Sequence, residues 1–256
     1  MSGKTIGSFG APGTGKSHFA RSAANVAKVA VACIDPGEES FYLQHPKIGE
    51  QQVATFFDDK WRPFHGKYEA TGYRGFMKWL DKQRSSDAQV IVIDPADELS
   101  DLIFHEVLKH SNTDDPREMP YGAAYIAHDR ALKEAINETR ALSYLGKDTI
   151  WIWHGRMREM EGAGDPEKGK SMQGDDVIEF EDRYLPAIGT NFRQHIAGMF
   201  QMWMYAYTKG QGPGTKYLLR ATQNLACNAK VRVEFKAGVQ ATMLPNDYKS
   251  LLEAIK

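Results

Sequence analysis

Residues Gly10-Ala11-Pro12-Gly13-Thr14-Gly15-Lys16-Ser17 stand between a short apolar run, residues 5–9, and a helical pattern that begins at Lys16. The octapeptide fits the pattern G-x-x-x-x-G-K-[ST] in full. Its glycines let the main chain curl so that successive N–H groups point inward at phosphate oxygens. The helix that follows adds the positive end of its dipole. The segment therefore predicts a phosphate-binding loop between a strand and a helix.

The polar residues of this loop have expected partners in a bound nucleotide. Lys16 would place a positive charge against the β- and γ-phosphates of ATP, and the Ser17 hydroxyl is an expected Mg²⁺ ligand. We therefore expect ATP and Mg²⁺ as cofactors. The candidate nucleotide-binding residues are Gly10, Ala11, Pro12, Gly13, Thr14, Gly15, Lys16, Ser17 and the next residue, His18.

Short apolar runs alternate with helical patterns through the first half of the chain, which is typical of a parallel sheet covered by helices. With no repeat or linker in 256 residues, we expect a single α/β domain, residues 1–256. Its central sheet is expected to be mainly parallel and flanked by helices, with a C-terminal antiparallel β extension around the hairpin-like turn at residues 209–214. The expected strands are residues 5–9, 29–34, 52–57, 89–93, 149–153, 199–207, 216–221 and 230–235. The expected helices are residues 16–28, a helix through 73–80, and 96–110, 121–145 and 248–255.

A carboxylate for the Mg²⁺ site is expected at the end of a second buried strand. Val90-Ile91-Val92-Ile93 is a continuous apolar run, and Asp94 follows it directly. α/β sheets bind ligands at the carboxyl ends of their strands. Asp94 is therefore the second candidate metal ligand beside Ser17.

The base that would activate an attacking water is less clearly marked. Pro95 follows Asp94, and the next acids are Asp97 and Glu98. The strand over residues 29–34 is followed by Asp35 and then by Glu38 and Glu39, which would reach a water in line with the γ-phosphate. Glu38 is our first candidate and Glu39 the second. An acidic surface turn after a strand stays open as the alternative.

The strand over residues 149–153 ends in His154, and residues 155–174 hold five glycines and no hydrophobic period. A polar side chain at this strand tip can sense the γ-phosphate and pass that state to the loop that follows. We expect a mobile loop there. A histidine in such a place is also a common structural residue.

Composition excludes several classes of protein. The formal net charge is −1, so nucleic acid would have to be bound by a local patch or by an assembly. The two cysteines lie far apart and give no disulfide framework or metal cluster. Since no apolar signal region precedes the first strand and no membrane-spanning run is present, we expect a cytoplasmic protein with no membrane partner.

The order of these parts resembles the RecA-like P-loop ATPases: a phosphate loop, an acidic turn after the second strand, an apolar strand ending in Asp94, and a polar strand tip at His154. More narrowly it resembles the small RecA-like ATP-binding proteins of bacteriophages that work with single-strand annealing and recombination. Lys230-Val231-Arg232 matches the K-x-R pair near the end of that group. One departure is that Glu38 lies three residues after Asp35 rather than two.

The resemblance implies a homo-oligomer with ATP between subunits, in which Lys230 and Arg232 reach the neighbour's γ-phosphate. An exposed pair on an edge strand is the alternative for these two residues. The resemblance also implies single-stranded DNA as a partner and, for a phage protein, the cytoplasm of the infected cell as its location. In this family the loop after the sensor strand, here residues 155–180, faces DNA.

The charges of the chain permit a DNA-binding patch in another segment, although DNA binding is expected mainly from the resemblance. Residues 155–180 carry seven acidic residues against four basic ones, which is a poor surface for phosphate. Residues 205–236 have a net charge of +5, with Tyr205, Tyr207 and Tyr217 available to stack on bases. These tyrosines pack within the sheet in the alternative interpretation.

Three functions follow from these residues. The first is a DNA-associated ATPase of recombination, annealing or replication. The second is an ATP-dependent assembly switch without catalysis, which the displaced Glu38 keeps open. The third is a P-loop phosphotransferase such as a nucleotide kinase, which the acidic character of residues 155–174 disfavours because a kinase lid is basic.

Overall fold

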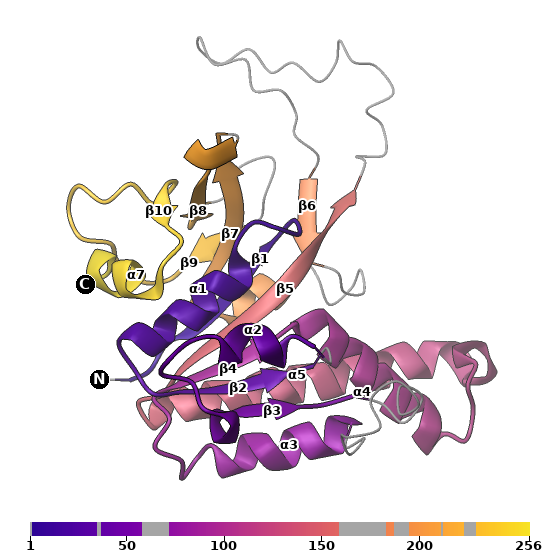
Figure 1. Cartoon of the computed structure of the whole chain (residues 1–256). Helices are drawn as coiled ribbons and strands as arrows, with labels where there is room; N and C mark the ends of the chain where they lie inside the picture. Colours follow the sequence, from indigo (N-terminus) through magenta and orange to yellow (C-terminus); the bar gives the residue numbers. More distant parts are fainter. Residues whose placement is uncertain are drawn as a thin grey trace, which may run out of the picture.

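The computed structural model describes residues 2–34, 37–57, 72–158, 183–186, 195–210, 212–222 and 229–256. A single sheet runs through the molecule in the strand order β10-β8-β7-β1-β5-β4-β2-β3, with β6 paired to β5 and β9 paired to β7. The strands from β7 to β3 in this order pair in parallel, and β6, β8, β9 and β10 pair antiparallel. The expected mainly parallel α/β fold with an antiparallel C-terminal extension is confirmed (Figure 1).

The strands are β1 Thr5–Gly10, β2 Val29–Cys33, β3 Val53–Thr55, β4 Val90–Asp94, β5 Asp148–Arg158, β6 Arg183–Pro186, β7 Met202–Lys209, β8 Lys216–Arg220, β9 Lys230–Val231 and β10 Leu244–Pro245. The α-helices are α1 Lys16–Ser22, α2 Glu39–Leu43, α3 Gly72–Lys82, α4 Ala96–His110, α5 Ala123–Tyr144 and α7 Tyr248–Ala254. Single 3-10 turns are η1 Ala23–Asn25, η2 Glu50–Gln52, η4 Pro116–Glu118, η5 Pro120–Gly122, η6 Ala197–Met199 and η7 Gly212–Gly214.

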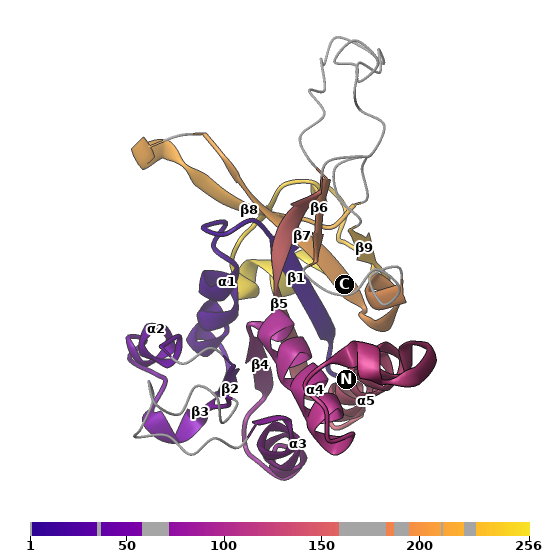
Figure 2. The same cartoon turned by 90° about the vertical axis from the view of Figure 1, so that its right-hand side faces the viewer.

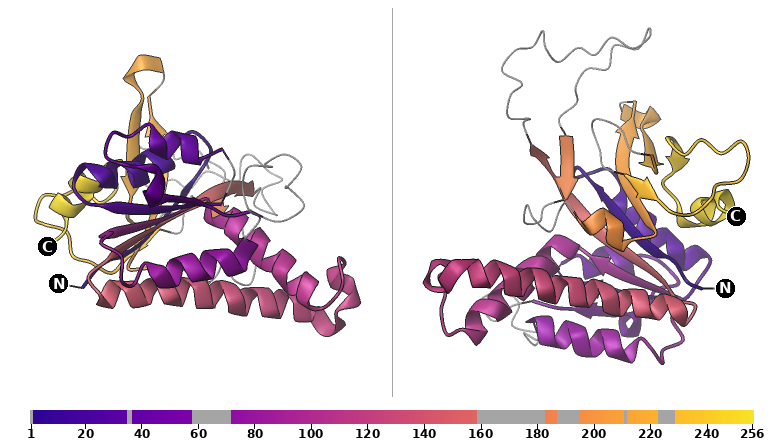
Figure 3. Two further views of the ribbon diagram at one scale, coloured as in Figure 1. Left: turned by 60° about the horizontal axis from the view of Figure 1, so that its bottom comes forward. Right: turned by 180° about the vertical axis from the view of Figure 1, so that it is seen from behind.

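Helices cover both faces of the sheet, because the central strands are apolar on both sides. Within β5, Trp151 and Trp153 join the core beneath α3, α4 and α5, whereas Ile150 and Ile152 join the core beneath α1 and α7. Figure 3 shows the two helical layers with the sheet between them. This is the period-2 alternation expected for buried strands.

The order β1-β5-β4 brings the carboxyl ends of β1 and β4 beside His154 of β5. Gly10, the last residue of β1, lies opposite His154 of β5, and Asp94 of β4 lies opposite Cys33 of β2. All these strands are parallel, so their carboxyl ends share one edge of the sheet. The phosphate loop, Asp94 and His154 therefore lie at the same edge.

Strand β5 is longer than its sequence predicts. It continues through residues 155–158, which we expected in a loop, because residues 155–158 pair with β6 after the partnership with β1 ends. Gly155 permits this path, since a Cβ there would lie 2.9 Å from the carbonyl carbon of Gly10. The rest of the expected loop, residues 159–174, lies outside the described residues.

Two other elements are shorter than expected. Helix α1 ends at Ser22, whose hydroxyl donates to the Phe19 carbonyl, and the chain tightens into the 3-10 turn η1. The strand expected over residues 230–235 is regular only at Lys230 and Val231, beside the start of β7, and Phe235 forms an isolated bridge to Ile255. Short elements without a sequence periodicity, such as α2 and β10, were not predicted at all.

The C-terminal extension projects from the rest of the fold. Strands β7 and β8 form an arm that reaches beyond the phosphate loop (Figure 2). Cys33 is a buried thiol, and Cys227 lies outside the described residues. Among the described residues, none of the helices has the length and apolar character that a membrane crossing requires.

Candidate functional site

The phosphate loop wraps from β1 into α1 around a cleft of about 750 Å³. Gly15 is the residue before α1 and has φ 81°, a left-handed conformation that glycine adopts without strain. Gly15 also lies close to the C-terminal extension, because a Cβ there would be 2.6 Å from the Asn246 side-chain nitrogen. The cleft is bordered by Pro12, Gly13, Gly15, Lys16, Ser17, His18, Gly37, Glu38, Phe41, His154 and Tyr217.

Lys16 is held by its own loop. Its ammonium group donates to the carbonyl oxygens of Gly10 at 3.0 Å and Ala11 at 2.8 Å, and the residue is 5% exposed. Burial lowers the pKa of Lys16 to about 8, although nearby Asp94, Asp97 and Glu38 favour its charged form. A phosphate anion at the loop would add to that stabilisation of the charge.

Asp94 lies at the end of β4 and is buried, with 2% of the residue exposed. Its carboxylate accepts a hydrogen bond from the Tyr42 hydroxyl, with 2.6 Å between the oxygens, and another from the side chain of Ser17. Burial raises the pKa of Asp94, and the two hydrogen bonds oppose that rise. Lys16 lies near enough to contribute to the electrostatics of the same carboxylate.

Ser17 and Asp94 fit a magnesium ion. A hydroxyl and a carboxylate in contact are hard oxygen donors, and Mg²⁺ in nucleotide sites is bound by one or two such groups together with phosphate oxygens and water. Clusters of three or more His, Cys, Asp or Glu side chains able to bind a metal are absent from the described part of the chain. The donors present thus suit a metal that is shared with a phosphate group.

His154 pairs with Asp97 at the edge of the cleft. The Asp97 carboxylate accepts from the His154 backbone N–H at 3.0 Å and from its ring nitrogen Nδ1 at 2.8 Å. The hydrogen bond to Asp97 raises the pKa of His154, and burial opposes that rise. Asp97 sits in the first turn of α4, directly beyond Asp94 and Pro95. The ring is therefore oriented from its Nδ1 side.

Of the two candidate bases, the structure brings Glu38 to the cleft. Glu38 precedes α2, and its charge favours the protonated form of Lys16. The Glu39 carboxylate instead accepts from the backbone N–H of Gly37, at 2.6 Å, and does not border the cleft. Asp35, from which we counted the spacing, lies outside the described residues.

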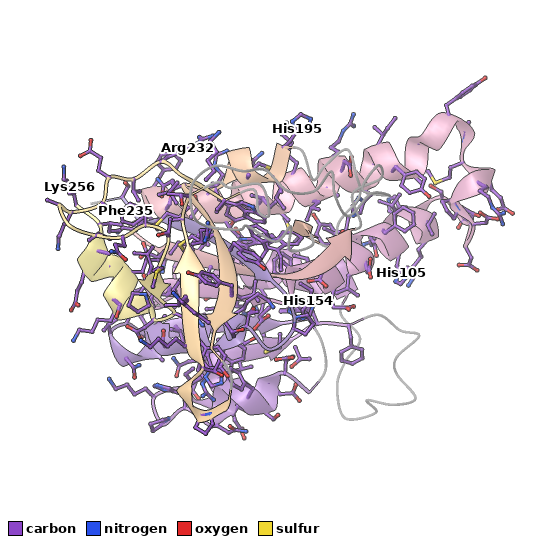
Figure 4. All side chains as sticks on the ribbon, turned by 90° about the horizontal axis from the view of Figure 1, so that it is seen from above. His105, His154, His195, Arg232, Phe235 and Lys256 are labelled. Carbon is purple, nitrogen blue, oxygen red and sulfur yellow. The ribbon has the colours of Figure 1, made fainter. Side chains whose placement is uncertain are left out.

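Lys230 and Arg232 lie away from this chain's own cleft. Lys230 is opposite Trp203 of β7, and that part of β7 runs beside Gly7, three residues before the phosphate loop. Arg232 donates to the Gly198 carbonyl at 2.8 Å. Figure 4 shows Arg232 and His154 far apart on the molecule. Lys230 and Arg232 are both exposed and Val231 between them is partly buried, as alternation along an extended segment predicts, although the regular pairing of β9 with β7 ends at Val231.

The three tyrosines of the expected DNA patch do not form one group. Tyr205 and Tyr207 stack with 6.0 Å between ring centroids, and the Tyr207 hydroxyl donates to the Thr242 carbonyl. Tyr217 pairs with Thr208, which alternation puts on the other face of the hairpin, and it borders the cleft. Of the acidic stretch over residues 155–180, the part beyond 158 lies outside the described residues.

Four residues of the site carry no sequence motif. Tyr42 contacts Asp94, and Asn246 donates to the Gly15 carbonyl at 2.7 Å. Phe41 borders the cleft under the guanidinium of Arg21, which lies 3.9 Å from the ring centroid. Tyr217 stands beside Gly15 with 49% of its surface exposed. Each arrives from a distant part of the chain, so local patterns give no signal for it.

The sequence model of a family described as "AAA domain" matches residues 2–233. No curated protein is similar enough to this chain to count as a relative. Among solved structures, the flagellar accessory protein FlaH from Methanocaldococcus jannaschii is 13% identical with a TM-score of 0.44, over 100% of this chain and 90% of that chain. The strand order and the phosphate loop are those of the RecA-like P-loop NTPase fold.

Proposed function

This chain belongs to the AAA domain family of P-loop NTPases, and on that premise we propose that it binds ATP with Mg²⁺ and hydrolyses it. The observation that carries the proposal is the convergence of Lys16, Ser17, Asp94, Glu38 and the His154–Asp97 pair on one cleft. A nucleotide phosphate chain requires such a set of groups: backbone donors, a point charge, metal ligands and a base.

The residues divide the reaction among them. Lys16 leaves the carbonyls of Gly10 and Ala11 and binds the phosphates, and Ser17 and Asp94 would hold a bound Mg²⁺. Bound Mg²⁺ would neutralise charge that develops on the phosphate oxygens. A water oxygen forms a bond to the γ-phosphorus as the bond to the bridging oxygen of ADP breaks, and Glu38 accepts the proton of that water. His154, oriented by Asp97, donates to the γ-phosphate.

A direct test measures ATP turnover and ATP binding with and without Mg²⁺. Release of phosphate that requires Mg²⁺ and is lost in Glu38→Gln, with ATP binding retained, supports the proposal. Binding of ATP without turnover in the wild type would favour the assembly switch instead. That second function is favoured by the spacing of Glu38 from Asp35, and it predicts an ATP-dependent change of mass in solution.

We further propose that the partner is single-stranded DNA, in phage recombination, annealing or replication within the host cytoplasm. Support comes from the arm β7–β8, where Lys209 and Lys216 are exposed at facing positions near its tip and Arg220 lies over the ring of Tyr207. Cationic side chains beside aromatic rings suit the phosphates and bases of a single strand. Titration of ATP turnover against single-stranded DNA tests this, and no response to any nucleic acid would reject it.

We also propose a homo-oligomer in which Lys230 and Arg232 act on the nucleotide of a neighbouring subunit. Support is their distance from this chain's own cleft and the exposure of both residues. Mixing Lys16→Met with Arg232→Ala tests it, because mixed assemblies would contain some interfaces with both groups intact. Recovery of turnover on mixing is expected. Turnover of Arg232→Ala equal to wild type would reject the role.

A further inference from the structure

Tyr42 is a buried side chain that the reaction above does not use. It is fully buried on α2, and its hydroxyl donates to Oδ2 of Asp94 at 2.6 Å. A buried tyrosine hydroxyl needs a hydrogen-bond partner, and here the partner is the expected metal ligand. The contact joins residues 52 positions apart in sequence, so it ties α2 to the end of β4.

The same short helix borders the cleft at its other side. Glu38 immediately precedes α2 and lies four residues, about one helical turn, before Tyr42. Phe41, the neighbour of Tyr42, points to Arg21 and the cleft instead. Helix α2 therefore links the candidate base to the carboxylate of the metal site, with Tyr42 as its contact to that carboxylate.

We propose that Tyr42 is a positioning residue that fixes the Asp94 carboxylate for Mg²⁺ and thereby locates the helix that follows Glu38. This inference rests on the proposed ATPase function. Mg²⁺ tolerates little distortion of its coordination, and the partners that orient a ligating carboxylate contribute strongly to metal affinity. Of the two donors to Asp94, Ser17 is itself an expected metal ligand. Tyr42 is the one whose role is orientation alone.

The surroundings of Asp94 explain why orientation matters. Lys16 and His154 both attract the carboxylate electrostatically from the cleft side. Tyr42, which belongs to the core and does not border the cleft, holds one oxygen by a hydrogen bond. Without that hydrogen bond the carboxylate would turn toward Lys16 and His154. An oxygen of Asp94 would then be available to the metal for a smaller fraction of the time.

The test is Tyr42→Phe, which removes one oxygen and keeps the ring. ATP affinity is measured first in EDTA, and Mg²⁺ is then titrated into the ATP complex by calorimetry. We expect the Mg²⁺ concentration at half-saturation to rise about tenfold, while ATP affinity in EDTA stays unchanged. A purely structural role for Tyr42 would not separate these two readouts.

Tyr248 supplies a matched control. It is also buried, and its hydroxyl donates to the Asp148 carboxylate, which does not border the cleft. Tyr248→Phe should lower the melting temperature and leave the Mg²⁺ titration as in the wild type. The same Mg²⁺ midpoint in Tyr42→Phe and wild type would overturn the positioning role.

Two further outcomes are distinguishable. A wild-type protein that binds no ATP, or binds it with no response to Mg²⁺, would reject the proposed ATPase function rather than the geometry of Tyr42 alone. If Tyr42→Phe does not fold, 3-fluorotyrosine at position 42 keeps the ring and strengthens the hydroxyl as a donor. A lower Mg²⁺ midpoint in that protein supports the inference, and an unchanged midpoint overturns it.

Discussion

Charged side chains are held in opposite ways at the phosphate edge of the sheet and in the arm β7–β8. At the phosphate edge, Lys16 and Asp94 are buried and bonded to neighbouring groups of the protein. In the arm, Lys209 and Lys216 are exposed to solvent. Coulomb interactions are strong in a buried site and screened in water. Single substitutions should therefore have large effects at the first place and small, additive effects at the second.

Removal of the Lys16 charge should have the largest effect. We expect Lys16→Met to lower ATP turnover by about 10³-fold, because a buried cation aimed at developing phosphate charge is lost. Lys147 is the matched control, since its buried ammonium group also donates to two backbone carbonyls, those of Ser86 and Ala88. Lys147→Met should reduce thermal stability with ATP turnover unchanged. An equal loss of ATP turnover in both variants would contradict the assignment.

The next effect separates two adjacent glutamates. Glu38→Gln should lower turnover by about 10²-fold or more, as expected for loss of a general base. Glu39→Gln should leave turnover nearly unchanged, because that carboxylate binds the Gly37 N–H outside the cleft. Single-turnover phosphate release measures both. A larger loss in Glu39→Gln would exchange the two roles.

A pH-dependent effect is expected at His154. Its pKa is raised chiefly by Asp97, so Asp97→Asn should lower that pKa. At pH values above the pKa, each unit by which the pKa of His154 falls lowers the protonated fraction about tenfold. As pH rises, turnover should therefore begin to fall at a lower pH in Asp97→Asn than in wild type. Identical pH–rate profiles would exclude a role for protonated His154.

The same pair contributes to stability with a defined sign. The raised pKa of His154 means that the folded state binds its proton more tightly than the unfolded state does. The stabilisation is complete below the unfolded pKa of about 6.5 and is lost as pH rises through the folded value. Urea unfolding of wild type and Asp97→Asn across that range measures the difference, which should shrink as pH rises.

The smallest effects should come from the arm. The double variant Lys209→Ala and Lys216→Ala should weaken binding of single-stranded DNA and reduce the salt dependence of binding by about one to two counterions. ATP affinity and melting temperature should not change. Lys249→Ala, on the exposed side of α7, is the control and should leave DNA binding intact. Loss of ATP binding in the double variant would mean that the arm serves the nucleotide instead.

Local patterns were sufficient for the parts of the site that lie within one strand–loop–helix unit. The phosphate loop, Asp94 and helix α4 were all predicted at their observed places, because alternation, glycine spacing and apolar runs are properties of neighbouring residues. His154 was expected at a strand tip, but β5 continues past it to Arg158, and only the pairing with β1 ends at His154. Its partner Asp97 was recognised only as an acid near Asp94.

Contacts between distant residues were beyond those patterns. Tyr42 reaches Asp94 across 52 positions, Asn246 reaches Gly15 across 231, and His154 reaches Asp97 across 57. The length of β5 likewise depends on β6, which begins at Arg183. The face on which Tyr217 lies was missed because it depends on the pairing of β7 with β8. Such registers are set by packing of the whole sheet.

Gly155 passes so close to the backbone of Gly10 that only a hydrogen atom fits where another residue would have its side chain. A methyl group in its place would press on main-chain atoms at 2.9 to 3.2 Å, and main chain cannot swing aside as a flexible side chain does. Alanine at position 155 would act as a one-carbon wedge between β5 and the base of the phosphate loop. The two backbones thus lie so close together that no residue larger than glycine fits at position 155 unless the main chain moves.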